Sequence, residues 1–266
     1  MSKDIKTDNY SLLFGDCLER MKEIPDGSVD MILTDPPYQT TQNKWDSIIP
    51  FESMWEQLKR VVKPNGACVL FSAQPFTTNL IYSNMKCFKY SMVWKKSKCG
   101  SPLTAKYKPL TKHEDVNVFS LHKKTLKYYP QMSEGKPYKR KFTENKVNNM
   151  GFGIKGVETD NNGTRHPTTI LDYPQQWRRQ DQVHPTQKPV ELMEFLIKSF
   201  SMENETVLDF TAGSMSTAIA CINTNRNGIM IEKDDHYFKV GSDRVAQALQ
   251  ELGDDRVKQV LNDKEN

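Results

Sequence analysis

Short hydrophobic runs alternate along this chain with segments whose apolar residues recur at helical spacing. Seven runs have the length and composition of strands: Ser11–Phe14, Val29–Thr34, Ala67–Ser72, Phe88–Trp94, Val116–Leu121, Val207–Phe210 and Gly228–Ile231. Five segments place apolar residues three or four positions apart: Asp16–Ile24, Phe51–Val62, Val190–Phe200, Ser216–Ile222 and His236–Leu252. This alternation predicts an α/β fold, with a mostly parallel sheet covered by helices on both faces.

The middle of the chain departs from this alternation. No clear helical pattern separates the runs Phe88–Trp94 and Val116–Leu121, so they are expected to form an antiparallel pair. Residues 122–182 are rich in Lys, Asn, Gly, Pro and Tyr and contain turn sequences such as NNMGFG and DNNGT. We interpret 122–182 as an insertion between a first part, 1–121, and a last part, 183–266.

The positive charge of the chain is concentrated in its middle. Residues 95–182 hold 18 Lys and Arg against 8 Asp and Glu, a net charge of +10, so the remainder carries −6 of the total of +4. Aromatic residues are interleaved with these cations: Tyr107, Tyr128, Tyr129, Tyr138, Phe142, Phe152, Tyr173 and Trp177. Cations bind phosphates and aromatic rings stack on bases, so nucleic acid is the expected partner.

Composition excludes several other classes of protein. No run of about 18 apolar residues is present, which argues against a membrane role. The N-terminal sequence lacks the long apolar core of a signal peptide, so we expect the protein to stay in the cytoplasm. The five cysteines form no CxxC pair and no grouping with histidine at zinc spacing, so neither disulfides nor a metal site is expected.

The first candidate site is the Asp-Pro-Pro-Tyr sequence, Asp35 to Tyr38, which directly follows a predicted buried strand. Ligands of parallel sheets bind beyond the carboxyl ends of the strands. The two prolines stiffen the loop and contribute no amide donors. The Asp35 carboxylate, the Pro36 carbonyl and the Tyr38 ring therefore suit a planar base with an amino group. The alternative is a rigid turn that carries a surface acid.

The second candidate site is the sequence VLDFTAGSMST, where a strand ending near Asp209 meets a turn of small residues and then a helix. Glu232 ends the next strand, 19 positions after Gly213. This arrangement is typical of nucleotide binding in a βαβ unit, in which the acid binds ribose hydroxyls. The glycine fingerprint is weak, because Met215 stands where a second glycine would be expected, and an ordinary turn is the alternative.

Together, TDPPY, HPTQKP and DFTAGSMST resemble the motifs of the S-adenosylmethionine-dependent amino-methyltransferases of DNA. The order of the motifs, with Asp-Pro-Pro-Tyr first, is similar to the permuted β class. The resemblance implies a circularly permuted, Rossmann-like, seven-stranded methyltransferase sheet with helices on both faces. It makes 1–121 the catalytic half, 122–182 an inserted target-recognition region and 183–266 the cofactor-binding half.

The resemblance also implies roles for single residues. The catalytic loop that receives a flipped base would be Asp35, Pro36, Pro37 and Tyr38. The S-adenosylmethionine site would comprise Asp16, Asp35, Thr186, Lys188, Asp209, Phe210, Thr211, Ala212, Gly213, Ser214, Ser216, Thr217, Glu232 and Lys233. Within it, Asp16 would face the adenine and Glu232 would bind the ribose. Met215 departs from the family, and its side chain there would crowd or weaken the cofactor or require a wider turn.

The expected activity is methylation of adenine N6 in double-stranded DNA, since an acid at position 35 favours adenine within the family. Cytosine N4 is the alternative substrate, and a degenerate relative that only binds DNA is the alternative protein, motivated by Met215. Methylation of cytosine C5 is disfavoured because no cysteine lies in an activating context. The resemblance further implies a homodimer and a role in restriction-modification, in the cytoplasm of a bacterial or phage-infected cell at the nucleoid.

Overall fold

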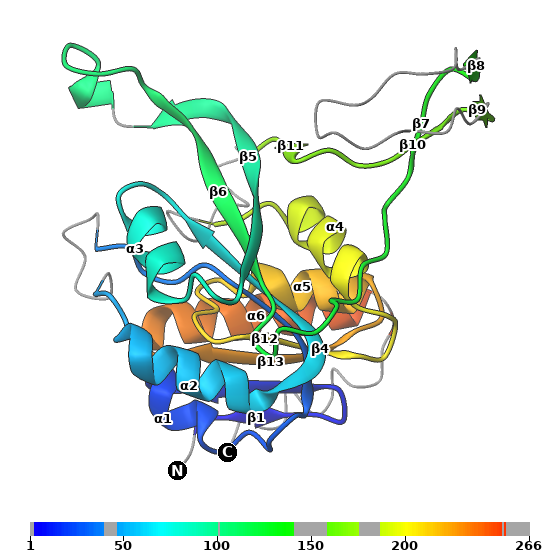
Figure 1. Ribbon diagram of the computed structural model, residues 1–266. Coiled ribbons are helices and arrows are strands. Elements are labelled where there is room, and N and C mark those ends of the chain that lie inside the picture. The colour runs from blue at the N-terminus through cyan, green and yellow to red at the C-terminus, as the bar shows by residue number, and fades with distance from the viewer. Residues whose placement is uncertain are drawn as a thin grey trace. The chain divides into compact units, whose positions relative to one another are not determined.

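The protein is built on one central sheet of nine strands in the order β1-β2-β13-β12-β3-β4-β6-β5-β11 (Figure 1). The computed structural model describes residues 3–39, 47–100, 102–140, 159–175, 187–251 and 253. The strands of this sheet are β1 (Ile5–Lys6), β2 (Tyr10–Phe14), β3 (Val29–Thr34), β4 (Val62–Ser72), β5 (Phe88–Gly100), β6 (Thr111–Phe119), β11 (Ile170–Asp172), β12 (Thr206–Asp209) and β13 (Asn227–Glu232).

All seven strands predicted from the sequence are present, and they form the centre of the sheet. Strands β2, β13, β12, β3 and β4 run parallel to their neighbours. Strand β6 is antiparallel to both β4 and β5, which confirms the predicted antiparallel pair. Two short edge strands, β1 and β11, extend the sheet beyond the seven. The sequence analysis missed both, because segments of two or three residues carry no hydrophobic alternation.

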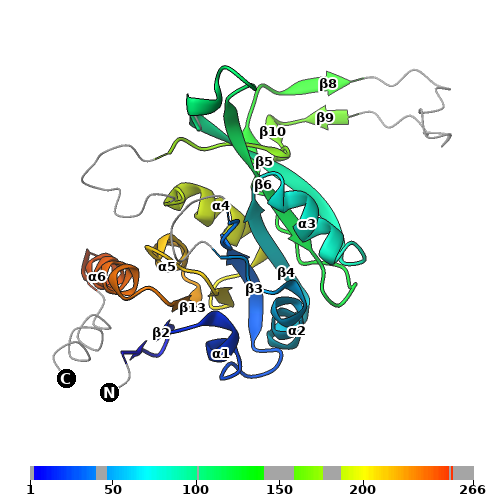
Figure 2. The same cartoon turned by 90° about the vertical axis from the view of Figure 1, so that its left-hand side faces the viewer.

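Helices cover both faces of the sheet. They are α1 (Cys17–Met21), α2 (Phe51–Val61), α3 (Phe76–Ser83), α4 (Val190–Phe200), α5 (Ser216–Asn223) and α6 (Asp235–Glu251). Figure 2 shows α2 and α3 on one side of the strands and α4, α5 and α6 on the other. In β3, Met31 and Leu33 pack in the core under α4–α6, whereas Ile32 packs in the core under α1–α3. Both faces of β3 are therefore buried, as its continuous hydrophobic run predicts.

Helix α3 was not predicted from the sequence. It follows the turn after β4 and buries Phe76, Thr77 and Leu80. Its composition, FTTNLIYS, contains several β-branched and aromatic residues, which are weak helix formers. Tertiary packing of Phe76 and Leu80 in the core under α1–α3 therefore outweighs local propensity here. In the described part of the chain, no helix combines the length and apolarity that crossing a membrane requires.

The chain divides into two compact units, one of residues 1–129 with 169–266 and one of residues 130–168. The second unit contains two short antiparallel pairs: β7 (Ser133–Glu134) with β10 (Thr164–Arg165), and β8 (Tyr138–Arg140) with β9 (Thr159–Asn161). Arg165 helps to hold this unit together, because its guanidinium lies 4.8 Å from the centre of the Tyr138 ring and also donates to Asn161 Oδ1 at 2.6 Å. The unit lies within the predicted insertion of 122–182.

Candidate functional site

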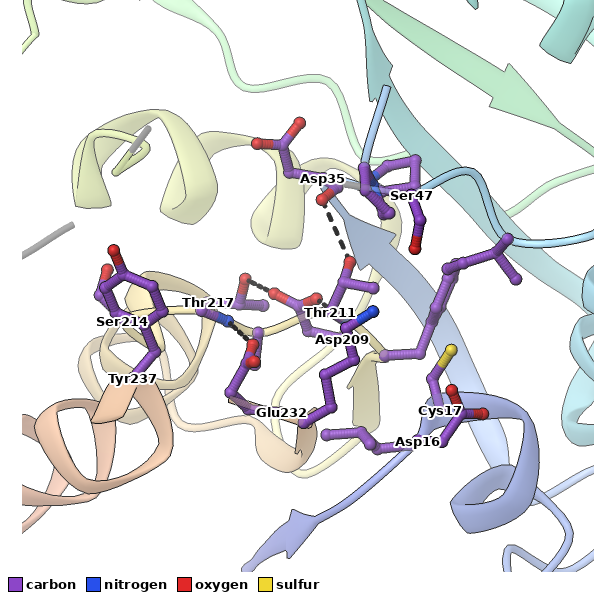
Figure 3. A pocket seen from close by; sticks show the side chains of 18 of the residues that line it. Asp16, Cys17, Asp35, Ser47, Asp209, Thr211, Ser214, Thr217, Glu232 and Tyr237 are labelled. Carbon is purple, nitrogen blue, oxygen red and sulfur yellow. Dashed lines mark hydrogen bonds between the residues drawn. The ribbon is translucent and has the colours of Figure 1, made fainter. Parts of the chain in front are cut away.

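A pocket of about 230 Å³ lies at the edge of the sheet where β2, β3, β12 and β13 end (Figure 3). These strands are parallel to one another, so their carboxyl ends meet at one edge. The loops that follow β3 and β12 form two of its walls, and Gly15–Leu18 after β2 and Glu232–Lys233 after β13 form others. The two candidate sites identified in the sequence are thus parts of a single pocket.

The loop after β3 holds Asp35 and Tyr38 in direct contact. The Tyr38 hydroxyl donates to Asp35 Oδ1, and the Thr211 hydroxyl donates to the Asp35 backbone carbonyl at 3.1 Å. One face of the Tyr38 ring stacks on Phe76, with ring centres 5.1 Å apart and planes inclined by 29°. Burial, and next the Asp35 carboxylate, raise the pKa of Tyr38, so its hydroxyl stays protonated. Tyr38 is therefore supported on one face and anchored at its hydroxyl.

The Asp35 carboxylate belongs to a cluster of alternating charges. The Lys188 ammonium contacts Asp35 Oδ2 and lies 3.3 Å from Glu114 Oε2, and the Lys96 ammonium contacts Glu114 Oε1. Burial raises the pKa of Asp35, and Lys188 opposes that effect. Burial would lower the pKa of Lys188, but Asp35 and Glu114 raise it above its ordinary value. Burial would likewise raise the pKa of Glu114, yet Lys188 and Lys96 hold it below its ordinary value.

Asp209 ties the end of β12 to the end of β3. Its Oδ1 accepts from the Thr34 hydroxyl at 2.6 Å and from the Thr211 amide at 3.1 Å, and its Oδ2 accepts from the Thr217 hydroxyl. The side chain is buried, and no cation contacts it among the described residues. Burial raises the pKa of Asp209 to about 6, despite the three hydrogen bonds that favour its ionised form. The carboxyl thus organises the turn at an electrostatic cost.

Glu232 fixes the turn after β12 from the neighbouring strand. Its Oε2 accepts from the Gly213 amide and its Oε1 from the Asp234 amide, both at 2.7 Å. Burial raises the pKa of Glu232, and these amide bonds oppose the rise. Gly213 has a φ of +52°, a conformation that glycine adopts without strain. The pairing of an acid after one strand with a glycine turn after the next, expected from the sequence, is present in the structure.

Met215 adopts a left-handed conformation, with φ of +58°, and its side chain is fully buried. It is not among the residues that line the pocket. Its side chain instead packs against Gly241 of α6, where a Cβ atom would lie 2.6 Å from Met215 Cγ. Glycine at 241 leaves the space that the methionine fills. The departure at position 215 is therefore accommodated in the core between α5 and α6, away from the pocket.

All but one of the site residues predicted from the sequence line this pocket, and the exception, Thr186, lies outside the described residues. Asp16 lines it as the N-cap of α1, where its carboxylate accepts from the Leu18 amide at 2.9 Å. Sequence reasoning missed Glu114 and Lys96, which reach Lys188 from the β5–β6 pair. It also missed Phe76, which supports Tyr38. No local signal marks these three, since their roles depend on the pairing of distant strands.

Comparison with known proteins gives a consistent result. A family model described as DNA methylase, N6_N4_Mtase, matches residues 29–243. The type II methyltransferase M.HpaI of Haemophilus parainfluenzae is 26% identical over 95% of this chain and 80% of its own length. The DNA adenine methyltransferase YhdJ of Escherichia coli K12 is 26% identical over 88% of this chain and 82% of its own length.

Solved structures share the fold. The PvuII DNA methyltransferase, described as cytosine-N4-specific, superposes with a TM-score of 0.66 at 18% identity, over 97% of this chain and 94% of its own. The putative DNA modification methylase TTHA0409 of Thermus thermophilus, solved with S-adenosyl-L-methionine, gives a TM-score of 0.56 at 21% identity, over 91% of this chain and 96% of its own. These likenesses cover the whole sheet and its helices.

Proposed function

The chain belongs to the DNA methylase family of N6 and N4 amino-methyltransferases, and we propose that it methylates adenine N6 in double-stranded DNA with S-adenosylmethionine as the donor. One observation carries the proposal. The Asp35–Tyr38 loop and the Asp209–Thr217 turn, which are far apart in the sequence, form opposite walls of one pocket. An amine held by the first wall would lie close to a methyl group held by the second.

The pocket residues fit S-adenosylmethionine. Phe210 and Ile231 offer apolar surface for its adenine, and Asp16, Glu232 and Lys233 supply polar groups around it. The turn at Gly213, fixed by Glu232, lets the backbone approach the methionine part closely. When bound, the cofactor supplies an electrophilic methyl group, and the new N–C bond forms as the S–C bond breaks and the amine releases one proton. The buried Met215 leaves this volume clear.

The Asp35–Tyr38 loop would bind and orient the target amine. An exocyclic amine is a poor nucleophile because its lone pair is delocalised into the base. Hydrogen bonds from the amine to the Asp35 carboxylate and to the Pro36 carbonyl would localise that lone pair and stabilise the positive charge that develops. Extrusion of the base costs a few kcal/mol. Stacking on Tyr38, which Phe76 supports from behind, would return roughly 1–3 kcal/mol.

Adenine is favoured over cytosine by the acid at position 35, as in the adenine-specific members of the family. Cytosine N4 stays the alternative, since it presents the same amino group to the same acceptors. Methylation of cytosine C5 needs a thiolate, and burial raises the pKa of Cys17 to about 12 and also raises those of Cys68 and Cys221. The packing of Met215 against Gly241 removes the main reason to consider a degenerate protein that only binds DNA.

We assign target recognition to the insertion of 122–182, between a catalytic half, 1–121, and a cofactor-binding half, 183–266. In the described part of the insertion, Lys139 and Arg140 are exposed on β8. A DNA substrate together with type II relatives also supports a role in restriction-modification at the bacterial nucleoid. Assembly as a homodimer is part of the same proposal.

The decisive experiment is sequencing of DNA from cells that express the protein, with a method that detects modified bases. We expect N6-methyladenine at one short sequence, and none in cells that express Asp35→Ala. The variant should keep its affinity for S-adenosylmethionine, measured by calorimetry, and for DNA. Modified cytosine N4 would favour the alternative substrate. Absence of any modified base, together with no cofactor binding at millimolar concentration, would refute an enzymatic role.

A further inference from the structure

Lys188 is held in place on every side. Its side chain is only 6% exposed, and its ammonium contacts the Asp35 and Glu114 carboxylates. Two aromatic rings surround the same ammonium, with ring centres 5.1 Å away in Phe71 and 6.0 Å away in Trp94. A lysine this buried loses its hydration, so it persists as a cation only because two acids compensate it. Such a site is built for one position of the ammonium.

The cluster around Lys188 is electrically balanced. It consists of two acids, Asp35 and Glu114, and two lysines, Lys188 and Lys96, and Lys96 also lies 5.4 Å from the centre of the Trp94 ring. Protonation of Asp35 would leave the cluster with an uncompensated positive charge in a desolvated place. The cluster therefore favours the carboxylate form of Asp35, against the effect of burial on that group.

The two oxygens of Asp35 differ in how firmly they are held. Oδ2 contacts the Lys188 cation, which the second acid and the aromatic rings fix in place. Oδ1 accepts only from the neutral hydroxyl of Tyr38 among the contacts described. A neutral donor is replaced by an incoming amine at less cost than a buried cation, because no charge is left uncompensated. Oδ1 is therefore the oxygen that exchanges partners.

We propose that Lys188 is a positioning residue that keeps Asp35 ionised and directs its Oδ1 to the target amine. This inference rests on the proposed function and replaces a direct cofactor contact as the main role of Lys188. The titratable groups that face Asp35 are Lys188, Glu114, Tyr38 and Asp209. Of these, only Lys188 is a cation. Loss of its charge would move the acid limb of the pH–rate profile upward, because Asp35 would take up a proton at higher pH.

The test is the pH dependence of single-turnover methylation of unmodified bacterial DNA. Lys188→Met keeps the aliphatic stem and removes the charge. We expect its acid limb to move up by at least about one pH unit, the low end of what an adjacent opposite charge does to a carboxyl, and the rate at neutral pH to fall tenfold or more. Lys188→Arg should restore most of the profile, and calorimetry should show little change in S-adenosylmethionine affinity for either variant.

A second variant gives the opposite sign. Glu114→Gln removes a like charge near Asp35, so its acid limb should move to lower pH, which a purely structural role of the cluster would not produce. An unshifted profile in active Lys188→Met, or loss of cofactor affinity without a shift, would overturn the inference. If Lys188→Met does not fold, an unshifted or upward-shifted Glu114→Gln profile would overturn it. Absence of product with the wild-type protein would instead refute the proposed function.

A different feature points to a DNA-contacting surface outside the insertion. Strand β4 pairs with β6 only as far as Asp115, so the outer parts of β5 and β6 project beyond the sheet as a hairpin (Figure 1). Residues 95–113 contain six lysines and no acid. Near the tip, Tyr107 is 87% exposed and Leu103 is 92% exposed. Exposed apolar side chains among several lysines mark a binding surface, and a polyanion is the partner that fits it.

We infer that this β5–β6 hairpin is an arm that grips duplex DNA, with Lys106, Lys108 and Lys112 on phosphates and Tyr107 against a base or sugar. The inference also rests on the proposed function, although the hairpin would bind DNA whether or not methyl transfer occurs. A second copy of this chain is disfavoured as the partner, since two such hairpins would repel each other.

The native Cys99 offers a direct probe of the arm, because it is exposed on the hairpin and the other four cysteines are buried. A maleimide fluorophore on Cys99 should change its anisotropy when unmodified duplex DNA is added, and added salt should reverse the change. The charge-removing variant Lys106→Gln/Lys108→Gln/Lys112→Gln should lower the slope of log affinity against log salt by roughly three. The matched control Lys6→Gln/Lys59→Gln/Lys86→Gln removes the same charge from exposed positions elsewhere.

Equal slopes in the two triple variants would overturn the arm, as would a probe that does not respond to DNA. A signal that depends on protein concentration without DNA would indicate self-association instead and would also overturn it. If DNA binding holds but no base is modified, the arm stands and the proposed methyl transfer fails.

Discussion

Replacement of Asp209 by asparagine is expected to change how the stability of the protein depends on pH. Burial raises the pKa of Asp209 to about 6 from an ordinary value of 3.8. Because the folded pKa is the higher one, ionisation opposes folding, and stability present below the unfolded pKa is lost as pH rises through about 6. The difference between the two pKa values corresponds to about 3 kcal/mol above that range. Asparagine cannot ionise, so the variant avoids this loss.

The assay is urea unfolding of wild type and Asp209→Asn at several values between pH 4 and pH 7.5. The free energy of unfolding of the variant, relative to wild type, should rise by about 2–3 kcal/mol across this range, since the unfolded carboxyl is already partly ionised at pH 4. The exposed Glu19→Gln change serves as the control. A difference between variant and wild type that stays constant within about 0.5 kcal/mol would refute the electrostatic reasoning.

The same variant should lose activity while it gains stability at neutral pH. The Asp209 carboxylate accepts hydrogen bonds from Thr34, Thr211 and Thr217, and so fixes the turn that faces the pocket. An amide in its place accepts at one atom only. We therefore expect weaker S-adenosylmethionine binding in Asp209→Asn, measured by calorimetry. A protein that retains a destabilising carboxylate at such a position retains it for function rather than for folding.

Three further changes test other parts of the site. Gly241→Ala should lower the free energy of unfolding by about 1–3 kcal/mol through overpacking against Met215, and by much less in the Met215→Gly background; equal losses in both backgrounds would contradict this packing. Phe76→Leu keeps bulk behind Tyr38 but removes the stacked ring, so single-turnover methylation should slow while cofactor affinity, by calorimetry, is kept. Lys139→Gln/Arg140→Gln should lower DNA affinity and flatten its salt dependence, and an unchanged slope would place the DNA surface elsewhere.

The central fold was predictable because its signals are local. The run VDMILT of β3 is hydrophobic without alternation, and the structure buries all six of its residues. The same holds for α4, whose bounds Val190–Phe200 coincide with the predicted ones. Edge strands such as β11 lack a pattern of their own and form only because a neighbouring strand, β5, offers free backbone groups.

The site was predictable to a different depth. Motifs identified the residues of the pocket, since Asp35, Gly213 and Glu232 all follow predicted strands or turns. What the sequence did not contain is the set of partners that each side chain has. The Lys96–Glu114–Lys188 contacts depend on the register of β5 against β6 and on where residue 188 approaches the sheet. Register is a tertiary property, and no local pattern encodes it.

The permuted order of the motifs is explained by the geometry of the sheet. The pocket takes one wall from the loop after β3, early in the chain, and another from the turn after β12, late in the chain. These two strands are parallel neighbours, with Val207 opposite Met31 and Leu208 opposite Ile32. Their carboxyl ends therefore meet whichever strand comes first in the sequence. A site built from strand ends depends on the order of strands in the sheet, so the chain can be entered at a different point while the chemistry stays in place.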